Sequence, residues 1–289
     1  MPRHPLAEVF GFPTSNVSRD AQRYRIHRLC PFNNKVPNCT KDKADNPLGV
    51  CSVFNGEQTA ITCPIRFRQE WLIAEDAARF FFAEGTTWTS LTEVRLSDKH
   101  GNLAGNIDIV LVAYNSAGKV VDFGALEVQA VYISGNVRRP FEYYMEDPTS
   151  RADMDWTRQV NYPRPDYLSS SRKRLAPQLL FKGEIINAWK KKIAVALDTS
   201  FLLTLPRLRE VDPQEADIAW LVYDLNLDEA NNRYCLTRQR TVYAKFGKSL
   251  SQITRPDVGG PKEFLDLLQA KLDEKLESPP DTQTIDLNI

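Results

Sequence analysis

Apolar residues recur along three consecutive stretches of the chain, Trp88–Leu96, Gly105–Tyr114 and Val120–Ile133. Their length and their β-branched residues predict three strands, on which side chains two residues apart point to the same face. The polar segments between them, DKHGN and NSAGK, have the composition of hairpin turns. The pattern therefore predicts three strands that pair in chain order.

Helical periodicity precedes and follows these strands. Apolar residues recur at helical intervals over Arg66–Glu84, which Gly85 would end, and a second apolar helix is expected from about Leu175 to Lys192. The later apolar segments IAVALDTSF and DIAWLVYDL are typical of buried strands. The order helix, three-strand meander, helix, strand predicts a mixed α/β fold. Pro261–Glu277 predicts an amphipathic helix, after which a loosely ordered tail is expected.

Composition excludes several classes of protein. With 289 residues, 42% of them hydrophobic and 26% charged, the chain has the composition of a soluble globular protein with a sizeable core. The net charge of zero argues against a uniformly basic surface, although a local basic groove remains compatible with it. No stretch approaches the roughly 20 apolar residues of a membrane span, and the first residues lack the apolar core of a secretory signal. We therefore expect a cytoplasmic protein with no membrane partner.

Four of the five cysteines lie in the first 64 residues, at Cys30, Cys39, Cys51 and Cys63. The polar segments between them are rich in Pro, Asn and Gly and are not expected to build a core of their own. Four thiolates around one zinc or iron ion would supply the missing cross-links, because metal binding then contributes to folding. The spacings are long and contain no CxxC, so four unrelated buried cysteines are the alternative. We expect a loop-rich, four-cysteine metal-binding module over residues 1–64.

Acidic residues occupy unusual positions in the three central strands. Asp108 lies inside an apolar run, where a carboxylate is costly to bury unless it is paired or binds a cation. Glu127 and Gln129 share one face of the third strand, and strand pairing would place Asp108 beside Glu127. A divalent cation relieves the repulsion of two close carboxylates, and Glu93 on the first strand is a third candidate ligand. The pattern predicts that Asp108, Glu127, Gln129 and Glu93 meet at a divalent metal ion and hydrolyse phosphodiester bonds, although each acidic residue alone is more commonly a solvated one.

Basic residues cluster after the third strand. Arg138 and Arg139 lie in a segment rich in aromatic residues and prolines, and Arg172, Lys173 and Arg174 follow three serines. Mixtures of arginine and aromatic side chains suit contacts with phosphates and base edges. These five residues are therefore candidate DNA contacts, with a solvated charge cluster as the alternative.

Several segments, over at least residues 1 to about 137, resemble the NotI-type type II restriction endonucleases. HPLAEVFG, LCPFNNKVPNCTKDK and PLGVCSV are similar to the N-terminal metal-binding module of that family. The resemblance implies a variant of the PD-(D/E)XK nuclease core, in which Asp108 matches the Asp of the motif. Glu127 and Gln129 match Glu-x-Gln, where the general motif has Glu-x-Lys, and Glu93 matches an upstream acidic position. Residues 65–256 would form this restriction-endonuclease-like core with DNA-contacting insertions, and residues 257–289 the C-terminal helix and tail.

The resemblance also implies a substrate and partners. Members of the family cut double-stranded DNA at GC-rich palindromes built on CGGCCG, with Mg²⁺ as catalytic cofactor and with iron, in the known case, at the four cysteines. Cutting both strands of a palindrome implies a homodimer. A bacterial cytoplasmic location and a cognate DNA methyltransferase, acting in the same restriction-modification system without being a stable partner, are expected.

Two other classes of function fit the same sequence. One is a non-catalytic, sequence-specific DNA-binding protein with a structural metal clip and acidic strands that only pack. The other is a protein-interaction module with a zinc clip. A nicking assay distinguishes the three classes. Cleavage in Mg²⁺ would indicate the nuclease, DNA binding without cleavage would indicate the non-catalytic DNA-binding protein, and no DNA affinity would indicate the interaction module.

Overall fold

The computed structural model describes residues 2–43, 45–256 and 258–277. The chain divides into two compact units, residues 1–254 and residues 255–289. The first unit contains both helices and strands, interspersed along the chain, so the predicted mixed α/β class is confirmed. Within the described ranges, no helix is both long enough and apolar enough to cross a membrane.

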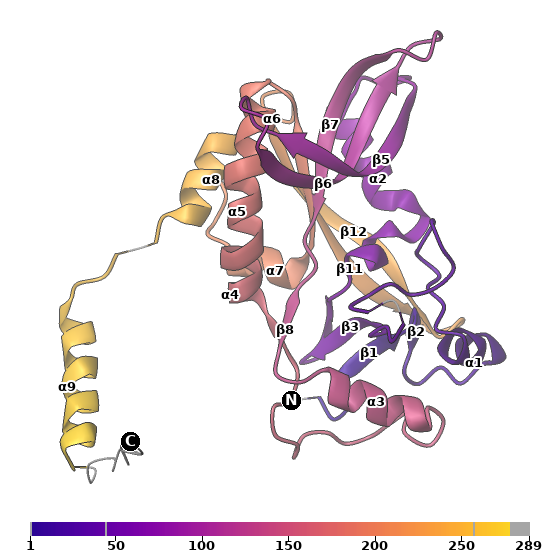
Figure 1. The fold of residues 1–289 in the computed structure, drawn as a ribbon, viewed down its shortest axis with the longest axis vertical. Coiled ribbons are helices and arrows are strands. Elements are labelled where there is room, and N and C mark those ends of the chain that lie inside the picture. Colours follow the sequence, from indigo (N-terminus) through magenta and orange to yellow (C-terminus); the bar gives the residue numbers. More distant parts are fainter. Residues whose placement is uncertain (1, 44, 257, 278–289) are drawn as a thin grey trace, which may run out of the picture. The chain divides into compact units, whose positions relative to one another are not determined.

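A six-stranded sheet forms the centre of the first unit, with the strand order β12-β11-β10-β7-β6-β5 (Figure 1). Neighbouring strands are antiparallel from β5 to β7, parallel from β7 through β10 to β11, and antiparallel again between β11 and β12. The strands are β5 (Trp88–Ser97), β6 (Leu103–Tyr114), β7 (Val120–Val128), β10 (Ile193–Asp198), β11 (Ile218–Asp228) and β12 (Arg233–Ala244). The three strands predicted from the sequence thus pair consecutively.

Helices cover both faces of this sheet. Helix α2 (Leu72–Phe81) packs on the face to which Ala194 and Ala196 of β10 point. The opposite face, with Val195, packs against a continuous helical run and against α7 and α8. The run consists of α4 (Tyr167–Ser170), α5 (Ala176–Gln178) and α6 (Glu184–Ala188), joined by the π-helical turns Ser171–Leu175 and Leu179–Gly183; α7 is Thr199–Thr204 and α8 is Phe246–Thr254. Because Pro177 lacks an N–H donor, a regular α-helix could not continue through this run, and the turn before it is widened.

The prediction of one helix over residues 66–84 is wrong at its start. Residues Pro64–Trp71 form 3₁₀ turns that break at Gln69 and Glu70, and α2 begins only at Leu72. Arg66, in these turns, donates hydrogen bonds to the carboxylate of Glu8 and to a backbone carbonyl of β12. These distant partners fix Arg66 in place and override the local helical periodicity.

The single strand predicted over residues 120–133 is also wrong, because two strands occupy it. Strand β7 ends at Val128, and β8 (Tyr132–Ser134) pairs with β9 (Arg164–Asp166). Between them, the N–H of Val131 donates to the carbonyl of Ile61, the last residue of β4. The chain therefore leaves the central sheet at this point and joins the N-terminal part of the unit.

The second predicted helix begins earlier and ends earlier than expected. The run starts at Tyr167 because the side chain of Asp166 accepts a hydrogen bond from the N–H of Ser169 and caps it. It ends at Ala188, and Lys190 beyond it has a left-handed φ of 57°.

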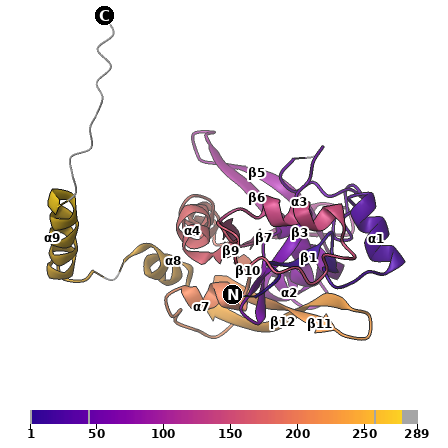
Figure 2. The ribbon, with the colours of Figure 1, turned by 90° about the horizontal axis from the view of Figure 1, so that it is seen from below.

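A second sheet, ordered β2-β1-β3-β4, forms in the N-terminal part. Its elements are β1 (Leu6–Val9), β2 (Phe12–Pro13), α1 (Arg19–Ile26), β3 (Val50–Asn55) and β4 (Gln58–Ile61). Helix α3 (Arg138–Glu146) lies over β1 and β3, and Figure 2 shows this arrangement. The sequence predicted no core here, but Phe141, Tyr144 and Trp156 from the later segment complete one. The division at residue 64 stays a prediction.

The buried His4 side chain should make this N-terminal core sensitive to acid. Its Nδ1 accepts a hydrogen bond from the N–H of Leu6, its ring packs edge-on against Tyr144, and burial lowers its pKa from 6.5 to about 4. The folded state thus disfavours the charged ring, so stability is complete above pH 6.5 and is lost as the pH falls toward 4. Unfolding by urea should show a loss of about 3 kcal/mol across this window.

The control for this prediction is His4→Asn, whose side-chain oxygen can replace Nδ1 as the acceptor for Leu6 and does not titrate. The variant should lose clearly less stability between pH 7 and pH 4. An identical loss in the variant and the native chain would contradict the assignment to His4.

In the second unit, α9 (Lys262–Glu277) confirms the predicted amphipathic helix. Its apolar residues, Phe264, Leu265, Leu267, Leu268, Leu272 and Leu276, are exposed. The tail predicted to be loosely ordered lies, from residue 278 on, outside the described residues.

Candidate active site

The structure brings Asp108 and Glu127 together at neighbouring positions of β6 and β7. Ile109 pairs with Leu126 in the antiparallel register, and the next step along both strands places Asp108 opposite Glu127. Oδ2 of Asp108 accepts a hydrogen bond of 2.8 Å from the N–H of Val128, the residue after Glu127. Glu127 is itself paired with Val195 of β10, whose side chain faces the helical run. The two carboxyl groups therefore share the side of the sheet that this run covers.

Burial and charge both act on Glu127. Its side chain is 5% exposed, and burial followed by the negative charge of Asp108 raises its pKa to about 8. The neighbouring ammonium group of Lys182 acts in the opposite direction. Such a pair of carboxyl groups favours either a retained proton or a nearby cation.

Lys182 is a site residue that the sequence analysis missed. Its Nζ lies 2.6 Å from Oε2 of Glu127 and 2.7 Å from the backbone oxygen of Asn106. The signal was present in the sequence, because Lys182 lies on the same helical face as the buried residues Leu175, Leu179 and Ile186. A lysine within an apolar stripe requires a partner when it is buried.

Gln129, two residues after Glu127, contacts the same helical run. Its Nε2 donates a hydrogen bond to Oε1 of Gln178, one turn before Lys182. Gln178 and Lys182 are four residues apart on the helical run, a distance of about 6 Å along its axis, and Glu127 and Gln129 are two residues apart on the strand, a distance of about 6.6 Å. The similar spacing allows both pairs of residues to meet. Oε1 of Gln129 is buried and has no hydrogen-bond partner among the described residues. This orphaned acceptor is available to a water molecule or a cation.

The chemistry of these groups fits a divalent cation such as Mg²⁺. Carboxylate and amide oxygens are the ligands that hard cations prefer, and Asp108, Glu127 and Gln129 offer both kinds. Among the described residues, no group of three or more His, Cys, Asp or Glu side chains is arranged to hold a metal ion. A cation here would therefore complete its coordination with the amide oxygen, water or a phosphate.

Glu93 lies on the neighbouring strand β5, but its side chain is not part of this contact. Thr92 pairs with Ile109 and Val94 with Ile107, so Glu93 stands directly across from Asp108. The side chain is exposed and makes no hydrogen bond or ion pair with the described residues. Its φ of 56° is left-handed, which is uncommon for a residue other than glycine within a strand.

The four N-terminal cysteines are free thiols close enough to influence one another. Burial raises the pKa of Cys30 to about 12, and the charges of Cys63 and Cys39 add to this effect. The pKa of Cys51 is raised by burial, then by Glu8 and by the other three cysteines. The donor set suits a thiolate-binding metal, although the thiols are not arranged in metal-holding geometry in the described chain.

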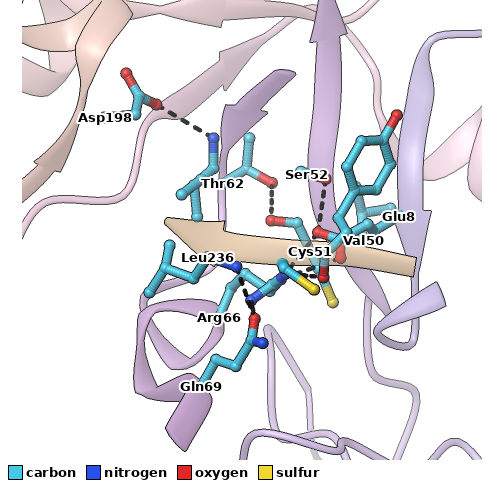
Figure 3. A network of polar contacts seen from close by, with 12 residues as sticks. Glu8, Val50, Cys51, Ser52, Thr62, Arg66, Gln69, Asp198 and Leu236 are labelled. Carbon is cyan, nitrogen blue, oxygen red and sulfur yellow. Dashed lines mark hydrogen bonds and ion pairs between the residues drawn. The ribbon is translucent and has the colours of Figure 1, made fainter. Parts of the chain in front are cut away.

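A buried polar network fixes the strand that carries Cys51, as Figure 3 shows. Glu8 of β1 accepts a hydrogen bond of 2.9 Å from Ser52 and pairs with Arg66 at 3.0 Å; both charged side chains are 0% exposed. Arg66 and Gln69 extend the network to β12 through the backbone of Tyr234 and Leu236. The network therefore joins the cysteine-bearing sheet to the central sheet.

The predicted DNA contacts divide into two groups. Arg138 and Arg174 line an open cavity of about 790 Å³ together with Lys41, Tyr132 and Val131. The other three predicted contacts, Arg139, Arg172 and Lys173, are not among the residues that line it.

Arg138 is paired with Asp42, and Arg139 lies with its guanidinium 5.7 Å from the ring centre of Trp156. Arg172 and Lys173 are exposed on the helical run. The cavity is lined both by the cysteine-bearing part, through Lys41 and Thr62, and by the segment Ala130, Val131 and Tyr132 that follows Gln129.

Comparison with known proteins assigns the chain to a family. The model of the family "Restriction endonuclease NotI" matches residues 15–236, which include the cysteines, the paired carboxylates and Lys182. A comparison with curated proteins gave no match. Because the family match covers most of the chain, the chain belongs to the NotI family of restriction endonucleases and is a site-specific deoxyribonuclease.

Proposed function

We propose that this type II restriction endonuclease hydrolyses phosphodiester bonds of double-stranded DNA with Mg²⁺ at the pair Asp108 and Glu127. The observation that supports the proposal is the position of Asp108 opposite Glu127 on neighbouring strands, two residues before Gln129, whose buried Oε1 has no hydrogen-bond partner among the described residues. The residues match the Asp and the Glu-x-Gln of the family motif. A GC-rich palindrome with a CGGCCG core is the proposed target, and the PD-(D/E)XK variant is the proposed core.

The roles of the residues follow from their chemistry. A divalent cation bound here would neutralise phosphate charge and lower the pKa of a bound water molecule. Asp108 and Glu127 would bind it, and the hydrogen bond from Val128 holds the Asp108 carboxylate in place. Gln129 carries no charge, so its free oxygen would orient the attacking water. Glu93, across from Asp108 on β5, would contribute to a second cation.

The cysteine cluster has a structural role in this proposal. Cys30, Cys39, Cys51 and Cys63 would bind one iron or zinc ion as thiolates. Burial raises the pKa values of Cys30, Cys39 and Cys51, so binding of the ion would displace protons from these thiols. The ion would stabilise the sheet beside the cavity that carries Arg138 and Arg174.

Cutting a palindrome also requires two active sites. Each subunit would cut one strand, so a C2 homodimer is the proposed functional state. Arg138, Arg139, Arg172, Lys173 and Arg174 are the proposed contacts with phosphates and guanine edges.

Arg174→Ala should weaken DNA binding in a salt-dependent way. The side chain lines the open cavity, where its guanidinium lies 6.0 Å from the ring centre of Tyr132. Loss of one phosphate contact lowers the slope of log K against log salt by about 1. Fluorescence anisotropy in Ca²⁺, over a series of KCl concentrations, measures this slope. The exposed Lys248 of α8 provides the control variant Lys248→Ala. An equal slope for Arg174→Ala and the native chain would contradict the assignment.

Digestion of unmethylated genomic DNA in Mg²⁺ and in EDTA tests the proposed function. Discrete fragments should form only in Mg²⁺, and sequencing their ends would give the recognition site and the cut position. Sequence-specific binding without cleavage in Mg²⁺ or Mn²⁺ would instead favour a non-catalytic DNA-binding protein. No affinity for DNA would favour a protein-interaction module.

A further inference from the structure

We propose that Lys182 supplies the positive charge that the strand position Gln129 lacks, so that the site receives its lysine from a helix. The inference rests on the proposed function, because it concerns the same site. It assigns a residue 55 positions away from Glu127 along the chain to the catalytic groups.

The contacts of Lys182 place its charge among these groups. Its Nζ donates to Oε2 of Glu127 at 2.6 Å and to the carbonyl of Asn106 at 2.7 Å, two residues before Asp108. These are its acceptors among the described residues. An ammonium has three N–H donors, so one remains for a phosphate oxygen.

The surrounding backbone is adapted to this side chain. Gly105 of β6 has a left-handed φ of 128°, and a Cβ there would lie 3.2 Å from Cδ of Lys182. The lysine stem thus crosses the strand where no side chain intervenes. Its side chain is only 7% exposed, and an ammonium buried to this extent is costly unless it is paired. An ion pair with Glu127 alone could form with the lysine side chain in several orientations. The lack of a side chain at Gly105 and the hydrogen bond to the carbonyl of Asn106 favour the one orientation observed.

The strand position itself is occupied by a neutral side chain. Gln129 is fully buried and bonded to Gln178, which precedes Lys182 by one turn of the same run. The turn Leu179–Gly183, in which Lys182 lies, is π-helical, and such widened turns are frequent at functional sites. The pair Gln129 and Gln178 is neutral, so the positive charge at this part of the site comes from Lys182.

The position of Lys182 also predicts competition with a divalent cation. In the structure its ammonium neutralises Glu127, a proposed metal ligand. A cation bound to the two carboxylates would weaken this ion pair and leave the ammonium to interact with the scissile phosphate. Lys182 is thus a cation that both holds Glu127 before metal binding and contacts the substrate afterwards.

Four variants test this proposal: Lys182→Met, Lys182→Arg, the double variant Gln129→Lys with Lys182→Met, and the control Lys248→Met on the exposed face of α8. Single-turnover cleavage in saturating Mg²⁺ should fall about 100-fold for Lys182→Met, the loss typical of one electrostatic group. Lys182→Arg should retain part of the rate, and the double variant should recover at least about tenfold over Lys182→Met, because the charge returns on the strand. Lys248→Met should cleave normally.

The second readout does not depend on activity. Calorimetric titration with Ca²⁺ should show tighter binding to Lys182→Met than to the native chain, because the competing ammonium is absent. Circular dichroism and the thermal midpoint would establish that each variant is folded. An unchanged rate and unchanged Ca²⁺ affinity in folded Lys182→Met would overturn the proposal. The proposal would also be overturned if Lys182→Met cleaved slowly and neither folded Lys182→Arg nor the folded double variant cleaved faster than it. Lys182 would then have only a structural role.

The two proposals fail differently. If Asp108 variants cleave normally, the proposed catalytic site itself is wrong. If they are inactive and Lys182→Met is fully active, the proposed site stands and the role of Lys182 is refuted.

Discussion

Asp108→Asn should abolish DNA cleavage while leaving sequence-specific binding intact. The substitution removes a carboxylate from the pair with Glu127 but keeps a side-chain oxygen to accept the hydrogen bond of 2.8 Å from Val128. The fold around β6 and β7 is therefore preserved, and the change is confined to the charge available to a cation. We expect the single-turnover rate constant in Mg²⁺ to fall on the order of 10³-fold or more.

The matched control is Asp122→Asn, on the same strand as Glu127. Asp122 is a more exposed carboxylate that pairs with Lys191 at 2.6 Å, away from the proposed site. This variant should cleave at nearly the native rate. Binding is measured in Ca²⁺ by gel shift with a cognate and a scrambled duplex. Cleavage by Asp108→Asn at more than about a tenth of the native rate would exclude Asp108 as an essential ligand.

Arg66→Met should lower the free energy of unfolding by about 3–5 kcal/mol, because it leaves the buried carboxylate of Glu8 without its partner. Both side chains of this pair are 0% exposed and 3.0 Å apart. The guanidinium also binds Gln69 and the carbonyl of Tyr234, and it lies 4.2 Å from the ring centre of Phe32. Loss of Arg66 therefore loosens the junction between the cysteine-bearing sheet and β12. Urea denaturation followed by circular dichroism measures the change.

Two further variants separate charge from packing in this prediction. The double variant Glu8→Gln with Arg66→Met should be less destabilised than Arg66→Met alone, because no unpaired charge stays buried. Arg79→Met is the exposed control; this side chain is 63% exposed, and Asp76 keeps its bonds to Arg238 and Tyr223. Its effect should stay below about 1 kcal/mol. Equal destabilisation by Arg66→Met and Arg79→Met would show that burial of the pair is not decisive.

Local sequence patterns were sufficient for the central strands and for the carboxylate pair. The two-residue periodicity of side chains on a strand correctly predicted that Glu127 and Gln129 lie on one face of the sheet and Val128 on the other, where Val128 packs against α2. Short turns made the pairing of β5, β6 and β7 predictable, and that pairing places Asp108 opposite Glu127. These features depend on neighbours in the sequence, which is why the sequence alone was informative.

Features that depend on distant partners were missed. The break at Gln69 and Glu70 follows from the bonds of Arg66 to Glu8 and β12, which no periodicity reveals. The end of β7 follows from the hydrogen bond between Val131 and Ile61. Lys182 contacts Glu127 only because the helical run packs against the face of the sheet to which Glu127 points.

The shared core of β1, β3 and α3 limits how relatives of this enzyme could be recombined. Phe141, Tyr144 and Trp156 fill the space beneath the N-terminal strands, so residues 1–64 do not carry all the apolar groups they need. A chimaera that exchanges only the first 64 residues would leave mismatched surfaces on both parts and should aggregate on expression. An exchange that also transfers residues 137–167 would move a complete hydrophobic interior and should remain foldable.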